Sequence, residues 1–143
     1  MRRDSVLRAL TRVGDGDAVT IRVTRENTLT GVLVCTLARG LGMRMRGYLT
    51  KGADRGRDGL FFVNTSSVHT FGMRFALDVV HLSRDGTVLR VVSSLPPRRL
   101  GPWVRGTRHI IELPSARGAL ELRAGDLIEI VPAKGSQRKE PLC

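Results

Sequence analysis

The chain has 143 residues, a length typical of one domain, and 41% of them are hydrophobic, which is enough for a single core. Arginine and lysine outnumber aspartate and glutamate by 24 to 13, which gives a formal net charge of +11. This balance is typical of proteins that bind nucleic acids or other anions, but it indicates non-specific affinity rather than a fold. Only three of the basic residues are lysines, a bias that a GC-rich coding sequence also produces.

The cysteines, histidines and apolar runs argue against several classes of protein. Cys35 and Cys143 lack CxxC spacing, and the three histidines show no ligand spacing, so we expect no disulfide framework, no metal and no cofactor. Residues 1–12 contain no apolar signal sequence, and no run approaches the roughly 20 apolar residues of a membrane helix. We therefore expect a cytoplasmic protein without membrane insertion.

Three segments are expected along the chain: a polar, basic stretch over residues 1–17, one globular domain over residues 18–132, and a flexible polar tail over residues 133–143. β-branched and apolar runs between turn signals predict seven strands, over residues 19–24, 31–35, 60–63, 75–83, 87–93, 109–113 and 127–131. Asp85-Gly86 predicts a hairpin with a two-residue turn, in which Val80 lies opposite Val91 and Leu82 lies opposite Leu89.

A helix is predicted after the second strand. Leu37, Leu41, Met45 and Leu49 recur every fourth residue, and Thr36 can cap a helix with its hydroxyl. Three glycines within this stretch each cost about 1 kcal/mol relative to alanine, so the helix needs a sheet to pack on. The predicted fold class is α+β: a curved, mostly antiparallel sheet, or a partly closed barrel, with one main helix packed on it.

Several motifs resemble, in order, those of one known family. They are the stretch at residues 39–49 with arginines and glycines in phase, the glycine-plus-apolar strand at residues 58–62, the segment 67–82 with its His-Thr-Phe-Gly-Met-Arg run, Pro102-Trp103, residues 110–114, and Gly125-Asp126. On these motifs, residues 18–131 resemble the uncharacterised "domain of unknown function 192" family. Ala76 departs from the pattern, because proline is usual there. The resemblance implies a fold group and names neither a reaction nor a cofactor.

Asp78 is the residue of the predicted hairpin that most needs a partner. Strand alternation places its carboxylate on the apolar face that carries Val80 and Val91, where an unpaired charge is costly. Arg74, four residues away on a straight strand, is about 13 Å distant, too far for a direct pair. We expect Asp78 to pair with Arg39 or Arg46, so that the predicted helix docks on the sheet.

The candidate ligand site is the segment that leads into this strand. His69, Phe71, Met73 and Arg74 combine a titratable ring, an aromatic ring, a thioether and a cation, and Trp103 could form a wall beside them. One interpretation is a pocket for a small polar or anionic ligand, with Arg74 as a charge clamp and His69 as donor or base. The alternative is that Phe71, Met73 and Trp103 are core residues.

Three functional hypotheses follow. The first is a non-enzymatic binding or accessory module that takes a small polar or anionic ligand, or a protein partner, around residues 69–78. The second is an enzyme of unknown class that uses the same region. The third is a nucleic-acid-binding protein that uses the arginine-rich residues 1–57, which carry most of the excess positive charge.

Overall fold

The structure, a computed structural model, describes residues 5–39, 57–115 and 121–131. Its main feature is a seven-stranded sheet with the strand order β5-β4-β6-β3-β2-β1-β7. A short helix, α1 (Ser5–Leu10), precedes β1 (Ala18–Arg25), β2 (Thr28–Ala38), β3 (Gly59–Phe62), β4 (Leu77–Leu82), β5 (Val88–Leu95), β6 (His109–Pro114) and β7 (Leu127–Val131). Each of the seven ranges that the sequence predicted to be extended overlaps one of these strands.

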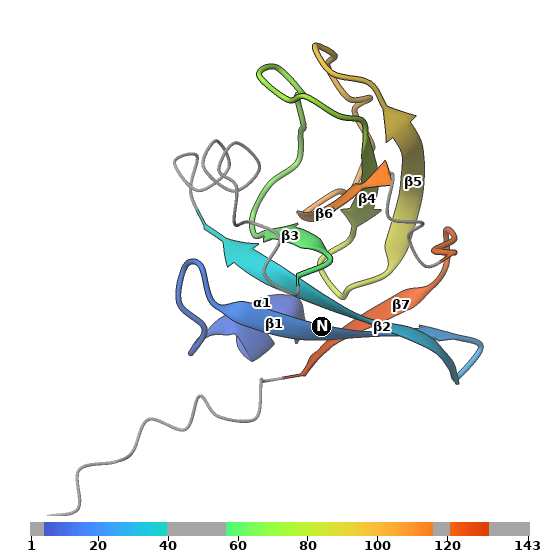
Figure 1. Cartoon of the computed structure of the whole chain (residues 1–143). Coiled ribbons are helices and arrows are strands. Elements are labelled where there is room, and N and C mark those ends of the chain that lie inside the picture. The colour runs from blue at the N-terminus through green and yellow to red at the C-terminus, as the bar shows by residue number, and fades with distance from the viewer. Residues whose placement is uncertain (1–4, 40–56, 116–120, 132–143) are drawn as a thin grey trace, which may run out of the picture.

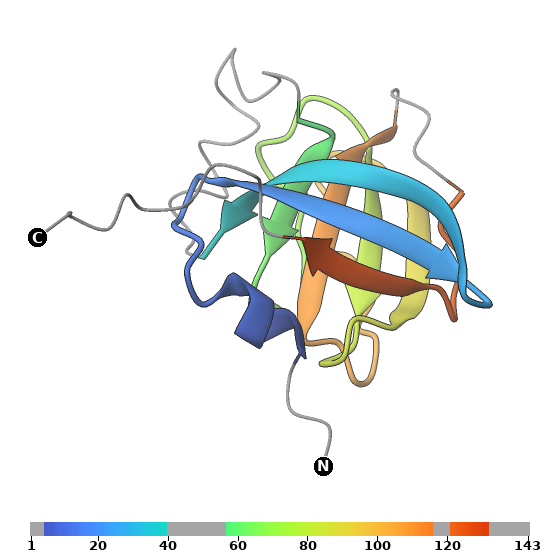
Figure 2. The same cartoon turned by 90° about the horizontal axis from the view of Figure 1, so that it is seen from below.

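The sheet is mixed, but most of it is antiparallel, as the sequence predicted. Strands β2 and β3 pair in parallel, and the five other neighbouring pairs are antiparallel. The sheet curves so strongly that β1, β2 and β7 lie on one side of the molecule and β4, β5 and β6 on the other (Figure 1, Figure 2). Its edge strands meet at one end, where the Val88 N–H donates to the Asp126 carbonyl at 2.8 Å. Among the described residues the contact is limited to an isolated bridge between Thr87 and Leu127 and its adjoining hydrogen bonds, and β5 and β7 are not neighbours in the strand order, so the sheet is not closed.

Side chains alternate across the strands, which gives the curved sheet an inner and an outer face. The inner face holds the larger core, in which Phe61, Leu82 and Ile111 are fully buried. Helix α1 adds Val6 and Leu10 to this inner core. These two residues are one helical turn apart and therefore lie on the same face of the helix. The N-terminal stretch that the sequence predicted to be polar thus packs on the domain from Ser5 onward. A smaller outer cluster covers the other face of β3, β4 and β6.

The predicted main helix is wrong over the residues that the structure describes. Residues 36–38 continue β2 and pair in parallel with residues 60–62 of β3. This pairing buries Leu37 completely, and such tertiary pairing overrides the cap and spacing signals that predicted a helix. Residues 40–49 of the predicted helix lie outside the described residues. Within the described ranges, the six-residue α1 is the only α-helix, and no helix there is long and apolar enough to cross a membrane.

The β4–β5 hairpin is confirmed, but its turn differs from the prediction. Val80 lies opposite Val91, as expected, whereas Leu82 lies opposite Val88 because the register shifts after His81. The Ser83 N–H donates to the Thr87 carbonyl at 2.9 Å, which leaves three residues in the loop rather than two. Gly86 has φ 88°, as a three-residue loop with a bulge requires.

Candidate binding surface

Two loops carry the residues of the predicted ligand site. Loop A comprises residues 63–76 between β3 and β4, and loop B comprises residues 96–108 between β5 and β6. The loops lie side by side at the top of Figure 1, where His69 forms an antiparallel bridge with Leu100. The Gly101 N–H also donates to the Val68 carbonyl at 2.8 Å. Backbone hydrogen bonds therefore hold the two loops together.

Thr70 is the residue that fixes loop A to loop B. Its side chain is fully buried, its hydroxyl donates to the Pro96 carbonyl at 2.6 Å, and the same oxygen accepts from the Arg99 N–H at 2.9 Å. Its own N–H donates to the Arg99 carbonyl at 2.8 Å, and its carbonyl accepts from the Arg98 N–H at 3.1 Å. Thr70 therefore holds the turn of loop B, in which Arg98 adopts a left-handed φ of 61°.

The two loops expose large apolar side chains. Leu100 is 73% exposed, Trp103 72% and Phe71 53%, the three highest values among the large hydrophobic residues that the structure describes. The rings of His69 and Phe71 contact each other, with centroids 5.5 Å apart. We define the double-loop surface as the side chains of His69, Phe71, Arg74, Leu100 and Trp103. Exposed apolar groups on a fixed backbone are typical of interaction sites.

The structure places the predicted site residues on an open surface rather than around an enclosed pocket. His69, Phe71, Arg74 and Trp103 are all exposed, so Phe71 and Trp103 are not core residues. Met73 differs, because it is partly buried and packs against the outer cluster, which fits its core interpretation. The charge-clamp role of Arg74 and the donor or base role of His69 stay predictions.

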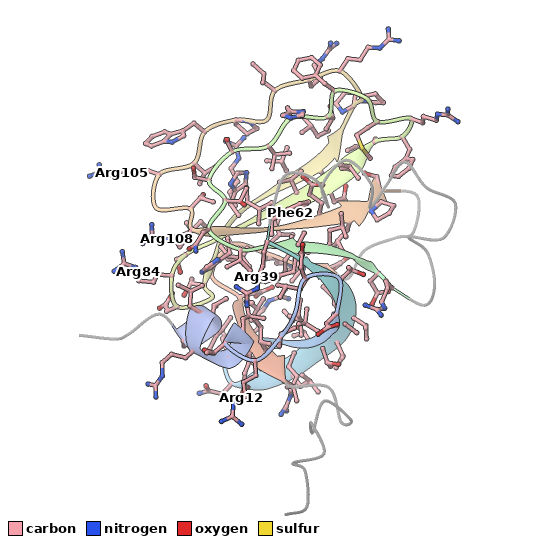
Figure 3. The ribbon with its side chains drawn as sticks, turned by 90° about the vertical axis from the view of Figure 1, so that its left-hand side faces the viewer. Arg12, Arg39, Phe62, Arg84, Arg105 and Arg108 are labelled. Atoms are coloured by element: carbon pink, nitrogen blue, oxygen red, sulfur yellow. The ribbon has the colours of Figure 1, made fainter. Side chains whose placement is uncertain are left out.

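Arginines extend this surface along one side. The segments 59–77 and 86–111 contain six arginines and no aspartate or glutamate. In Figure 3, Arg84 from the β4–β5 turn and Arg105 and Arg108 from loop B point outward at the same side of the molecule. The Arg108 N–H donates to the Leu82 carbonyl at 2.8 Å, which holds loop B against the end of β4. We call Arg84, Arg105 and Arg108 the arginine edge.

Asp78 has partners other than the predicted arginines. Its Oδ1 accepts one hydrogen bond from the Ser94 N–H at 2.8 Å and another from the Ser115 hydroxyl at 2.7 Å. These bonds join the start of β4 to the ends of β5 and β6. They satisfy one carboxylate oxygen with uncharged donors.

Arg39 instead binds the C-terminal end of α1. Its Nη2 donates to the carbonyls of Leu10 and Val13 at 2.6 and 3.1 Å. The predicted ion pair between Asp78 and Arg39 is therefore wrong. The register of the strands gives the physical reason. Residue 38 pairs with residue 62 of β3, which pairs in turn with residue 110 near the start of β6. Asp78 pairs with residue 113, toward the other end of β6. Arg46, the other predicted partner, lies outside the described residues.

A cavity of about 360 Å³ lies beside Asp78, at the end of the curved sheet where the edge strands part. It is lined by Asp78, Val80, Val91, Ser93, Leu113, Glu121, Leu122 and Arg123. Asp78 thus shares a face with Val80 and Val91, as strand alternation predicted. Sequence reasoning missed the wall at residues 121–123, because no local signal relates that segment to β4 and β5.

His81 and Cys35 are buried titratable groups that belong neither to the double-loop surface nor to the lining of the cavity. His81 faces outward, opposite Arg90, and its Nδ1 is 3.0 Å from the Thr107 hydroxyl. Burial and the charge of Arg90 lower the pKa of His81. On the inner face, burial raises the pKa of Cys35 to about 12. No group of three or more histidine, cysteine, aspartate or glutamate side chains among the described residues could hold a metal ion.

The strand order, the hairpin and the motif series can be compared with known proteins. The family model of DUF192, described as "Uncharacterized ACR", matches residues 21–135. The chain belongs to the DUF192 family. No curated protein matches it.

Two solved structures resemble this DUF192 chain in fold. One is a "putative transcription regulator" from Sinorhizobium meliloti 1021, with a TM-score of 0.65 and 18% identity, over 82% of this chain and 96% of that chain. The other is a protein of unknown function from Novosphingobium aromaticivorans DSM 12444, with a TM-score of 0.61 and 20% identity, over 78% of this chain and 84% of that chain. At these identities the likeness shows the fold alone.

Proposed function

We propose that this DUF192 chain is a non-enzymatic binding module whose double-loop surface binds an acidic, partly apolar segment of a partner protein. The observation that carries the proposal is the exposure of Phe71, Leu100 and Trp103 by more than half on loops tied together by hydrogen bonds. Tryptophan, phenylalanine and arginine are enriched at protein interfaces, and aromatic anchors often supply most of the binding energy. Loops that are already fixed lose little conformational entropy on binding.

The charge of the surroundings supports an acidic partner. The segments that form loops A and B carry arginines and no carboxylates, and the arginine edge extends from loop B to the β4–β5 turn (Figure 3). Arginine binds carboxylates through paired hydrogen bonds, so acidic side chains beside an apolar anchor match this surface. The arginines of loops A and B are all exposed, so a small anion held by them would stay in contact with water. Of the two ligands that the sequence allowed, we therefore favour the protein segment over the small molecule.

The nucleic-acid hypothesis shares the charge argument but fits the apolar groups less well. Unpaired bases stack on exposed aromatic rings, and Trp103 and Phe71 could serve in that way. Leu100, the most exposed of the large apolar side chains described, offers no ring for stacking and fits an apolar pocket of a protein better. The "putative transcription regulator" among the similar structures is the observation that keeps nucleic acid as the second candidate.

The composition of the loops also favours binding over catalysis. Loops A and B contain no cysteine, aspartate or glutamate, and His69 is their only histidine. A catalytic base or nucleophile generally needs a neighbouring group that orients or activates it. The ring that contacts His69 is Phe71, which cannot do either.

Selection from a displayed peptide library tests the proposal. We expect the full chain to enrich peptides that combine aspartate or glutamate with one or two large apolar residues. A synthetic peptide of the enriched sequence should bind at least tenfold more weakly to Trp103→Ser, because truncation of a central aromatic anchor costs more than about 1.4 kcal/mol. Replacement of Arg105 and Arg108 by glutamine should also weaken binding and reduce its dependence on salt.

Leu29→Ser is the matched control. Leu29 is 48% exposed near the tip of the β1–β2 hairpin, away from the two loops (Figure 1), so its loss should leave the affinity unchanged. Enrichment of peptides without acidic residues, or equal losses in Leu29→Ser and Trp103→Ser, would contradict the proposal. Tighter binding of a single-stranded oligonucleotide than of any selected peptide at 0.15 M salt would replace it with the nucleic-acid hypothesis.

A further inference from the structure

We propose that the cavity beside Asp78 binds a small organic cation, namely a primary ammonium group on a short apolar chain. The inference is separate from the proposed function, because the cavity is lined by β4, β5, β6 and residues 121–123 and not by loops A and B. A ligand there would enter the curved sheet at the end where β5 and β7 no longer approach each other.

The floor of the cavity is apolar. Val80, Leu113 and Leu122 belong to the inner core, and Val91 packs against that core. At about 360 Å³ the cavity is near the lower end of the usual size of small-molecule sites. An alkyl chain of a few carbons would contact these side chains and be removed from water, which is favourable by about 0.8 kcal/mol for each buried methylene.

Asp78 supplies the group that binds the head of such a ligand. Both of its hydrogen bonds within the described part of the chain end on Oδ1, and they come from two different elements. They fix the orientation of the carboxylate at the edge of the cavity. A carboxylate has about four acceptor sites, so Oδ2 keeps the capacity to accept hydrogen bonds from an ammonium group.

The described residues that line the cavity include two carboxylates, Asp78 and Glu121, and one guanidinium, Arg123, so their formal net charge is negative. The Arg123 guanidinium is 3.3 Å from the Glu121 carboxylate, so these two compensate each other. A carboxylate ligand would be repelled by Asp78, and an alcohol of the same length would lack the charge-assisted hydrogen bond. The cavity therefore selects a cation, although the chain as a whole is basic.

Titration of the ¹⁵N-labelled full chain with butylammonium, followed by amide chemical shifts at constant ionic strength, tests this site. We expect shifts at residues 78–80, 91–93 and 121–123, and a Kd at least tenfold lower than that of butanol or butyrate. Ethylammonium should bind more weakly than butylammonium by about fourfold for each missing methylene.

Asp78→Asn should raise the Kd of butylammonium about tenfold or more, because hydrogen bonds to charged groups contribute about 1.5–3 kcal/mol. The asparagine carbonyl can still accept from Ser94 and Ser115, so the variant should fold. Glu129→Gln, which removes an exposed carboxylate of β7 that does not line the cavity, is the control and should bind as the unmodified chain does.

Val91→Phe gives a second test, because a larger side chain at this half-buried wall fills the cavity and should abolish the shifts. Equal affinity for butanol or butyrate, unchanged affinity in Asp78→Asn, or shifts confined to other residues would overturn the inference. Trp103→Ser should leave butylammonium binding intact, so failure of this inference and failure of the proposed function are distinguishable.

Discussion

Replacement of Thr70 by valine should loosen the double-loop surface while keeping the shape of the side chain. The hydroxyl of this fully buried residue donates to the Pro96 carbonyl and accepts from the Arg99 N–H. Valine can do neither. Pro96 is exposed, so its carbonyl can turn to water, whereas the Arg99 N–H loses its acceptor.

The size of the effect follows from these two bonds. A typical hydrogen bond contributes about 1 kcal/mol, and a polar group left without a partner costs about 1–3 kcal/mol. We therefore expect Thr70→Val to lower the free energy of unfolding by about 2 kcal/mol. With a urea m-value of about 2 kcal/mol/M, the midpoint of unfolding should fall by about 1 M.

Urea unfolding and amide hydrogen exchange measure this prediction. The Arg99 amide should exchange faster in Thr70→Val, and the variant should bind the selected peptide more weakly because its loops are less ordered before binding. Thr28→Val, at an exposed position of β2, is the control and should change stability by less than about 0.5 kcal/mol. An unchanged urea midpoint together with unchanged Arg99 exchange would refute the view that Thr70 holds the loops.

Three further predictions concern the scaffold. Gly59→Ala should lower the free energy of unfolding, measured in urea, by about 3 kcal/mol. A Cβ at this position would lie 2.1 Å from the Glu112 carbonyl oxygen and would push β3 away from β6. A decrease of less than about 1 kcal/mol would contradict this close approach. The hydrogen bond from Arg25 lowers the pKa of Asp126, so the stability it contributes is present above the ordinary value of about 3.9 and is lost as the pH falls through the lower folded value. Unfolding free energies measured from pH 6 to 2 should therefore decline less in Asp126→Asn than in the unmodified chain, and parallel profiles would speak against the pair. Cys35 is fully buried and has a pKa of about 12, so its thiol should resist iodoacetamide at pH 8 in the folded chain. In a variant without the second cysteine, we expect labelling only after urea is added. Rapid labelling of the folded variant would show that the Cys35 thiol is accessible.

The strands were predictable because their signals are local. Alternating or continuous β-branched runs bounded by turn residues define all seven, and alternation also placed Asp78 on the face of Val80 and Val91. The family could be identified from the motif series for a similar reason, since the motifs occur in order along the chain.

The errors came from contacts between distant segments. Thr36 and Leu37 carry helix signals, yet their parallel pairing with β3 keeps them extended, and that pairing depends on residues more than twenty positions away. The charge of Asp78 was recognised, but its partners Ser94, near the end of β5, and Ser115, just after β6, are fixed by strand pairing that no local signal defines. A polar N-terminal segment likewise concealed Val6, which α1 buries in the inner core.

The sequence predicted which segments carry the candidate site, but not whether its side chains are buried or exposed. His69, Phe71 and Trp103 drew attention by residue type, and residue type alone cannot distinguish a core position from an exposed one. Their exposure depends on the bonds between loops A and B, above all those of Thr70. The sequence left a pocket and a surface open as forms of this site, and the exposure of His69, Phe71 and Trp103 favours the surface.

The most direct test of the proposed function is the affinity of the peptide selected on the unmodified chain, measured by fluorescence anisotropy at 0.15 M salt for Trp103→Ser and Leu29→Ser side by side. The proposal predicts at least a tenfold higher Kd for Trp103→Ser and an unchanged Kd for Leu29→Ser. Equal Kd values for these two variants would contradict it, because the exposed rings of the double-loop surface would then contribute no more than any other exposed apolar side chain.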